Sequence, residues 1–380
     1  MSRRTFSEPL LVGTLGLILF VQILDVVIMY PLGALMMNSL HFNLQAFTVL
    51  VAAYSISAAV AGVIFSFFID YFERRRTLMI TITGFAVATL LCGLVQTPYA
   101  FLICRCIAGV FGGILAAQIQ TIVADVIPVE RRGRAMGTIM TAHSLSSILG
   151  IPLSLLLAEH AGWRAPFVAV AVIAALLLIA THYIVPVLNE QLPSKQTINM
   201  KKACQHWVSV MSIPAYRAGL LLGVANMLAI FMVLGLCVPY IANNLGFGAA
   251  DLSLIYLVGG SITLITSRLI GWLSDAYHPV SVFTALCIFG TLWMAGMTVF
   301  PLLPFGITVA YAAVLMMFNN GRIISASVVV SKISKPESRG TLMAIQSALQ
   351  QIAIGIGVIL SGLLVETGPQ GEVLHYPRTA

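Results

Sequence analysis

LLVGTLGLILFVQILDVVIMYPLGALMM, residues 10–37, is an apolar run that contains a single charged residue, Asp25. About 20 residues of helix cross the hydrocarbon core of a bilayer, so this run predicts a membrane-spanning helix. Arg3 and Arg4 precede it as the basic residues of a signal peptide would. The run is too long for a signal peptide, however, and no small-residue cleavage sequence ends it.

The composition of the whole chain indicates the same environment. Of its 380 residues, 59% are hydrophobic and 9% are charged, and the mean hydropathy is +0.99. A soluble domain carries about 25% charged residues, which excludes a water-soluble fold of this length. Further apolar runs lie at 47–69, 77–96, 98–124, 135–158, 165–186, 218–241, 251–272, 280–300, 304–328 and 341–365. The sequence therefore predicts an all-α polytopic membrane protein with eleven evident spans.

The net charge of +7 reflects membrane topology and not nucleic-acid binding. With the N-terminus in the cytoplasm, 15 of the 20 Lys and Arg residues lie on the cytoplasmic side and two lie outside. This is the distribution that the positive-inside rule requires, and no basic face with interleaved aromatics appears. We expect a multi-pass protein of the bacterial inner membrane with a cytoplasmic N-terminus. The six cysteines lack paired C-x-x-C spacing, so no metal or other cofactor is expected.

Two pairs of matching motifs indicate an internal duplication. PVERRGRAM (128–136) precedes the fifth run and PESRGTLM (336–343) precedes the eleventh, with their Arg-Gly pairs 207 residues apart. Asp70 and Asp275, which end the second and eighth runs, are 205 residues apart. Internal duplication is typical of transporter folds, and chance similarity of basic loops is the alternative.

The duplication and the polar segment in the middle of the chain predict the domain organisation. We expect an N-terminal six-helix bundle over 1–186, a cytoplasmic linker over 187–217 and a C-terminal bundle over 218–380. Five spans are evident in the second bundle, where a six-plus-six protein has a sixth. Either this twelfth helix is absent or the sequence is a fragment.

Asp25 is the only carboxylate deep inside any apolar run. A charge at the centre of a membrane helix costs at least about 2.5–3.5 kcal/mol, which makes such a residue a candidate for function. Gln22, Asp25 and Met29 are spaced i, i+3 and i+7, so they share a helix face that we expect to line a central cavity. Asp25 would then carry a proton or contact a substrate. A structural carboxyl bonded to a neighbouring helix is the alternative.

The other polar residues inside runs have two readings each. Arg105 needs an acceptor or counter-charge, and it either controls proton loading at Asp25 or bonds structurally to backbone carbonyls. Gly109 and Gly113 form a G-x-x-x-G spacing that permits close helix contact. His143 is a candidate proton relay or a hydrogen-bonded core histidine. Six uncharged residues either join helices or line a polar cavity: Asn226, Gln118, Asn319, Asn320, Gln346 and Gln350.

Catalytic motifs are not evident. The sequence has no Walker lysine motif, no H-E-x-x-H and no serine elbow, so we expect neither ATP-driven pumping nor an enzyme.

These residues together resemble the major facilitator superfamily, specifically its proton-coupled drug and sugar efflux branch. SFFIDYFERRR (66–76) resembles the loop motif G-x-x-x-D-x-x-G-R-R between spans two and three, with Ser66 and Glu73 in place of glycines. GWLSD (271–275) resembles its second-half copy. RCIAGVFGG (105–113) resembles the R-x-x-x-G motif of span four.

The region after span four adds to the resemblance. Asp125 with 128–134 is similar to the loop that follows this motif, and SSILGIP (146–152) with GWRAPF (162–167) is similar to span five of arabinose-efflux-like permeases. Ser154 stands where a glycine is common. The resemblance implies helix packing at Gly150 and Pro152.

The resemblance also implies a cytoplasmic latch and a mechanism. The latch residues are Asp70, Arg74, Arg75, Arg76, Asp125 and Asp275. Asp70 would lie near Gly340, and the three arginines would pair with carboxylates such as Asp125 or Glu130. The implied mechanism is alternating access by a monomeric secondary transporter, with protons and a small organic solute as partners. Proton-coupled efflux is the leading function. Uptake, or a non-transporting receptor or assembly role, is the alternative.

Overall fold

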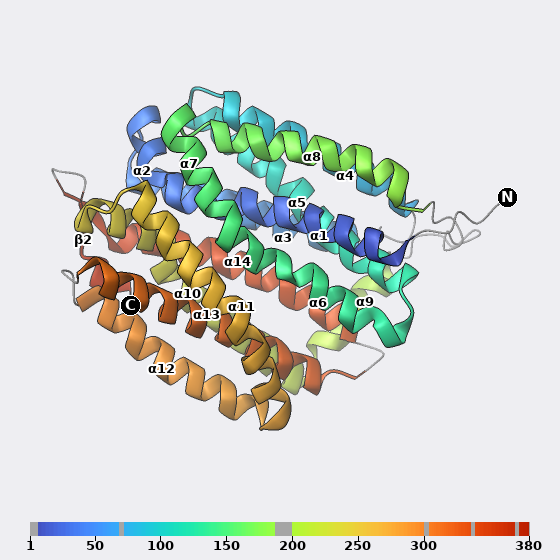
Figure 1. Cartoon of the computed structure of the whole chain (residues 1–380). Helices are drawn as coiled ribbons and strands as arrows, with labels where there is room; N and C mark the ends of the chain where they lie inside the picture. The colour runs from blue at the N-terminus through green and yellow to red at the C-terminus, as the bar shows by residue number, and fades with distance from the viewer. Residues whose placement is uncertain are drawn as a thin grey trace.

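The computed structural model describes residues 7–67, 72–186, 200–299, 304–335, 339–368 and 372–379. Within these residues, 11 helices are long and apolar enough to cross a membrane. They run side by side along one common direction (Figure 1). The prediction of an all-α polytopic membrane protein is confirmed.

The first half of the chain, up to residue 186, forms six spans. Its helices are α1 (Glu8–Val27), α2 (Met29–Leu40), α3 (Leu44–Ser66), α4 (Arg74–Leu94), α5 (Pro98–Val126), α6 (Val129–Leu145), the π-helix η2 (Ser146–Gly150), α7 (Ile151–Ala161) and α8 (Ala165–Ile184). Several begin at a capping side chain. Asn43 accepts a hydrogen bond from Ala46 N at 2.9 Å, and Thr97 accepts one from Ala100 N at 3.3 Å.

The second half, from residue 200, forms five spans and a short C-terminal segment. Its helices are α9 (Met200–Met211), α10 (Pro214–Leu245), α11 (Ala249–Ala276), α12 (Pro279–Val299), α13 (Phe305–Ile333) and α14 (Arg339–Leu364). We call the end of the molecule where α1 begins and α9 lies the linker face. The opposite end, where α2 ends and β2 (Val373–Leu374) lies, is the hairpin face (Figure 1).

Prolines interrupt two of the spans that the sequence predicted as continuous. The first span breaks at Ile28, between α1 and α2, because Pro31 has no N–H to bond the carbonyl of Val27. The fifth span contains the π-helix η2, which ends just before Pro152. The ring of Pro152 likewise leaves the carbonyl of Ile148 without its usual donor, and π-turns accommodate such a gap.

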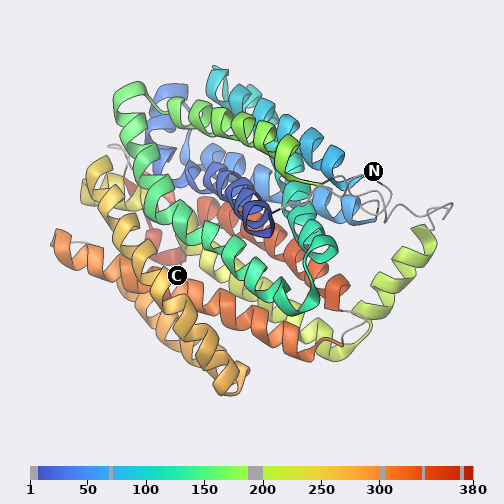
Figure 2. The ribbon, with the colours of Figure 1, turned by 45° about the vertical axis from the view of Figure 1, so that its right-hand side comes forward.

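The segment expected to be a polar linker contains α9. Met200, Trp207, Val208 and Met211 recur at helical spacing, and Trp207 packs on Phe67 with ring centroids 5.2 Å apart. Helix α9 lies at the linker face, beside the ends of the long helices (Figure 2). Helix α10 begins at Pro214, inside the stretch predicted as linker up to residue 217.

The segment after α14 is also structured. β1 (Glu366–Thr367) pairs antiparallel with β2, with Glu366 opposite Leu374, and η3 (Tyr376–Thr379) is a 3-10 turn. Tyr376 is fully buried, stacks on Tyr240 with ring centroids 4.3 Å apart, and donates its hydroxyl to Val233 O at 2.9 Å. Burial raises the pKa of Tyr376. The tail is therefore fixed to α10 at the hairpin face.

The two halves meet mainly through α3 and α14, α2 and α10, and α7 and α11. Near the hairpin face, Gln45 Nε2 donates to Val365 O at 3.4 Å, and Tyr30 lies 6.4 Å from Phe231 between ring centroids. A methyl group on Gly362 of α14 would lie 2.9 Å from Thr48 Cγ2 of α3, which shows how closely the two helices approach there. The hairpin face is closed by these contacts.

Candidate functional site

A buried ion pair joins α1 to α5. Asp25 Oδ2 lies 2.7 Å from Arg105 Nη1, and the same nitrogen donates to the main-chain oxygen of Asp25 at 3.3 Å. Asp25 is 0% exposed and Arg105 is 1% exposed. Each charge is therefore neutralised by the other, as burial in an apolar environment requires.

Helix α3 contributes an aromatic ring to this pair. The guanidinium carbon of Arg105 lies 4.5 Å from the ring centroid of Tyr54, within range of a cation–π interaction. Gln22 Nε2 donates to the hydroxyl of Tyr54 at 3.0 Å. The side chains of Gln22, Asp25, Tyr54 and Arg105 form one contact network from three helices, which we call the ion-pair network.

Glycines on α5 allow α3 to approach closely enough for these contacts. A methyl group on Gly109 would lie 3.0 Å from Tyr54 Cα, and one on Gly113 would lie 2.7 Å from the carbonyl carbon of Ala58. Both neighbours are backbone atoms, which cannot rotate away. The G-x-x-x-G spacing thus faces α3, a partner that the sequence did not name.

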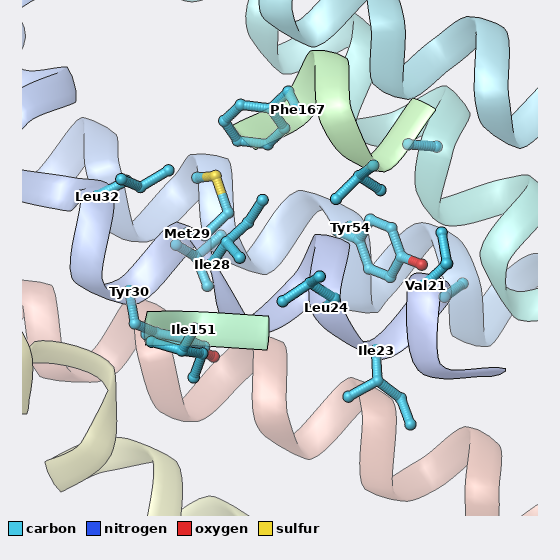
Figure 3. Close-up of a cluster of buried hydrophobic side chains, with 14 of the residues drawn as sticks. Val21, Ile23, Leu24, Ile28, Met29, Tyr30, Leu32, Tyr54, Ile151 and Phe167 are labelled. Atoms are coloured by element: carbon cyan, nitrogen blue, oxygen red, sulfur yellow. The ribbon is translucent and has the colours of Figure 1, made fainter. Parts of the chain in front are cut away.

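The helix face formed by Gln22, Asp25 and Met29 was expected to line a cavity. All three residues are buried. Figure 3 shows Leu24, Ile28 and Met29 inside a cluster of apolar side chains, with Tyr54 alongside. In this conformation the face packs on neighbouring helices.

Two polar atoms of the pair remain unbonded. Asp25 Oδ1 and Arg105 Nε are buried and have no hydrogen-bond partner among the described residues. The free oxygen can accept a proton while the other oxygen still bonds Arg105. This arrangement can change its charge without first breaking a contact.

His143 and Asn226 take no part in the ion-pair network. The imidazole of His143, on α6, is exposed. Asn226 lies on α10 and is buried, and its Oδ1 and Nδ2 have no hydrogen-bond partner in the part of the chain that is described.

The basic run at the start of α4 joins helices of the first half. Arg74 Nε lies 2.9 Å from Asp125 Oδ2 on α5, and Arg75 donates to the main-chain oxygen of His182 on α8. Glu73 caps α4 by accepting from Arg75 N at 2.9 Å and from Arg76 N at 2.6 Å. The residue that replaces the second motif glycine thus acts as a helix cap.

The remaining latch and packing residues are placed as follows. Asp70 lies outside the described residues, and of Asp275 only the backbone, in α11, is described. A methyl group on Gly150 would come within 2.6 Å of Leu24 Cδ1, so η2 packs directly on α1. Pro152 is half-buried at the start of α7.

Tyr54 is the network residue that sequence reasoning missed. It lies in the second apolar run, where an aromatic residue is expected in any case. The nearest signal was the G-x-x-x-G face, which requires a partner helix without identifying its register. Only the packed helices show that this ring covers Arg105.

Eleven candidate spans, two halves in contact at one face and an ion pair inside the first half define a polytopic membrane protein built like a secondary transporter. The family model of the Major Facilitator Superfamily matches residues 15–358. The chain therefore belongs to this superfamily, and the resemblance noted in its motifs is confirmed.

Curated relatives include two drug-resistance proteins. Multidrug resistance protein MdtG of Escherichia fergusonii is 26% identical over 247 residues, covering 63% of this chain and 59% of the relative. Multidrug resistance protein 1 of Bacillus subtilis is 26% identical over 248 residues, covering 64% and 61%. The match thus spans about three fifths of the length of each. The uncharacterized MFS-type transporter YceJ of Bacillus subtilis is 23% identical, covering 92% and 88%.

Solved structures share the fold. A bacterial homolog of the human lysosomal transporter Spinster, inward-facing and unoccupied, superposes with a TM-score of 0.79 at 14% identity, covering 96% of this chain and 83% of that one. The xylose transporter XylE of E. coli, inward open, gives a TM-score of 0.71 at 18% identity, covering 98% and 92%. At these identities the likeness shows the architecture.

Proposed function

We propose that this chain exports a small organic solute in exchange for protons, by alternating access. Family and fold are those of secondary transporters and not of enzymes. Two curated relatives are named for multidrug resistance, which favours efflux. The observation that carries proton coupling is the buried pair of Asp25 and Arg105.

The chemistry of this pair supports a coupling role. A proton on Asp25 Oδ1 neutralises the carboxylate and weakens its attraction for Arg105, whose guanidinium stays charged at any physiological pH. The weakened pair loosens α1 from α5 and from the ring of Tyr54. Proton binding thereby favours a different packing of α1, which is the two-state element that coupling requires.

The packing of the two halves supports the direction of opening. Contacts between α3 and α14 close the hairpin face, so we assign this conformation as open toward the linker face. Most basic residues lie in the linker-face segments, which favours the cytoplasm on that side of a bacterial inner membrane. We propose a monomer of two bundles, 1–186 and 218–380 with the linker between them, although α10 starts within that linker.

The test is solute-driven proton movement in proteoliposomes that enclose a pH-sensitive dye, with two solutes measured separately: ethidium, a cation, and phenyl β-D-glucopyranoside, which is neutral. We expect Asp25→Asn to reduce this movement to the level of empty liposomes, because the amide has nearly the same size and cannot titrate. Glu159→Gln changes an exposed carboxylate on α7 in the same way and should keep the wild-type rate. Arg105→Ala should shift the pH dependence of transport, whereas Asp25→Asn should remove it.

Two outcomes would contradict the proposal. If Asp25→Asn keeps full proton-coupled flux, Asp25 is structural and His143→Gln becomes the next variant to measure. If the wild-type chain moves no protons with either solute, a non-transporting role on the same scaffold replaces this one.

A further inference from the structure

Three amide side chains lie on the facing parts of α10 and α14 in the second half. They are Asn226 on α10 and Gln346 and Gln350 on α14. Asn226 is 6% exposed and Gln346 is 4% exposed, whereas Gln350 is half-buried. Gln346 and Gln350 are four residues apart and therefore share one face of α14. We call these three residues the amide cluster.

Gly223 places the cluster in the helix interface. A methyl group on Gly223 would lie 3.4 Å from Gln350 Nε2 and 3.6 Å from Gln346 Nε2, so both glutamine tips converge on the bare side of this glycine. Asn226 follows three residues later on the same face of α10. The cluster lies about 18 Å along α10 from its linker-face end, on the side of the membrane that we assign as open.

The two helices are farther apart here than toward the hairpin face. A methyl group on Gly357 would lie 2.9 Å from the main-chain oxygen of Leu228, so backbone meets backbone there. At Gly223 the nearest atoms are instead the tips of long side chains. The interface therefore widens toward the linker face, where glutamine side chains lie between the two helices.

The polar atoms of the cluster are left without partners. Asn226 Oδ1 and Nδ2, Gln346 Oε1 and Nε2, and Gln350 Nε2 are buried and form no hydrogen bond within the described residues. Buried amides that join helices normally bond one another or the backbone, and an unmade bond costs about 1–3 kcal/mol per group. Three such groups in one widened interface indicate a ligand that completes their bonds.

The free atoms also specify the charge of that ligand. Two acceptor oxygens and three donor nitrogens match groups that both donate and accept, such as hydroxyls and amides. Described cations on the neighbouring α13 face other helices: Arg322 Nε lies 3.6 Å from where a methyl group on Gly290 of α12 would be, and Lys332 donates to Ser274 O of α11 at 2.9 Å. A charged ligand would lose its hydration without gaining a counter-charge.

We infer that the amide cluster binds the polar part of the transported solute, and that this solute is neutral and carries hydroxyl or amide groups. The inference rests on the proposed transport function and names its substrate class. The inference places solute binding in the second half of the chain and proton exchange in the first half.

Binding to the purified full chain in detergent tests the inference without any proton gradient. The probes are phenyl β-D-glucopyranoside, which is neutral, its anionic counterpart phenyl β-D-glucuronide, and the cation tetraphenylphosphonium. We expect the glucoside to raise the Tm and to bind at least tenfold more tightly than either charged probe. Asn226→Leu and Gln346→Leu should each weaken glucoside binding about tenfold or more, and Gln350→Leu, at a half-buried position, should do the same.

The Tm without probe distinguishes recognition from a structural role. Replacing an unpartnered buried amide by leucine should leave the Tm unchanged or raise it. Gln22→Leu is the matched control: it removes a buried amide that is bonded to Tyr54, and it should lower the Tm. Amides that merely join the helices through water would make Asn226→Leu and Gln346→Leu behave like this control.

The inference is overturned if the glucoside gives no shift, if a charged probe binds more tightly, or if the leucine variants leave glucoside affinity unchanged. Glucoside binding is measured without a proton gradient, so its readout is separate from that of proton movement. If the wild-type chain binds the glucoside but moves no protons, the proposed function has failed. If it moves protons but does not bind the glucoside, the inference about the amide cluster has failed.

Discussion

The ion-pair network of the first half and the amide cluster of the second half are both buried polar sites, yet they are completed differently. Within the ion-pair network, Asp25 bonds Arg105 and Gln22 bonds Tyr54, so its four side chains are partners for one another. In the second half, Asn226 and Gln346 have no partner among the described residues. A site whose polar groups bond one another can hold a buried charge, whereas a site whose polar groups lack partners can bind a ligand.

The helix spacing follows the same division. Glycines of α5 meet the backbone of α3 directly, which leaves no space beside the ion pair. Gly223 of α10 meets glutamine side chains and not backbone, so the interface there is filled by groups that can move. The comparison predicts that the first site depends on tight packing and that the second does not.

The largest effect is expected from breaking the ion pair from either side. Asp25→Leu leaves a permanent buried cation and should reduce the free energy of unfolding by about 3–5 kcal/mol at every pH. Arg105→Leu leaves a carboxyl that a proton can neutralise, so its defect should shrink as the pH falls. Thermal unfolding of both variants between pH 5 and 8 measures this difference. Equal defects with equal pH dependence would mean that the pair does not respond to protons.

A smaller effect is expected from adding one methyl group to each interface. Gly113→Ala should destabilise the protein by about 2–3 kcal/mol, because the backbone of Ala58 cannot move aside. Gly223→Ala should be neutral or slightly stabilising, because alanine favours helix and only flexible side chains lie nearby. Thermal unfolding in the same detergent compares the two. A similar loss of stability in both variants would show that the two interfaces are equally tight.

The smallest effect concerns the tail, which is fixed to the second half outside both sites. Tyr376→Phe removes the hydrogen bond to Val233 O and keeps the stacking on Tyr240, so it should cost about 1 kcal/mol. Glucoside binding and proton movement should both keep their wild-type values. A loss of either would show that the tail communicates with one of the sites, which the comparison does not predict.

The spans and the importance of Asp25 could be predicted from the sequence, because length, hydropathy and the cost of a buried charge are local properties. The breaks at Ile28 and in η2 required attention to prolines within the runs. Helix α9 was missed because the linker was read by its charges, although its apolar residues recur at helical spacing.

The contacts between helices could not be derived from the pattern. Tyr54 over Arg105 depends on the register of α3 against α5, and nothing in either run specifies that register. The glutamines of α14 had two open readings, because a polar residue that joins helices and one that meets a ligand look alike until their neighbours are known. The partner of Arg74 was anticipated through the family resemblance, and the cap formed by Glu73 was not.

The contact of Tyr54 with Gly112 restricts how this protein can evolve. A methyl group at position 112 would lie 2.8 Å from Tyr54 Cζ, so an alanine there requires a smaller or displaced ring at position 54. A smaller ring would uncover Arg105, and the charge pair would then need a new neighbour. Substitutions at positions 54 and 112 should therefore occur together among descendants of one ancestor, as a correlated pair that links α3 to α5.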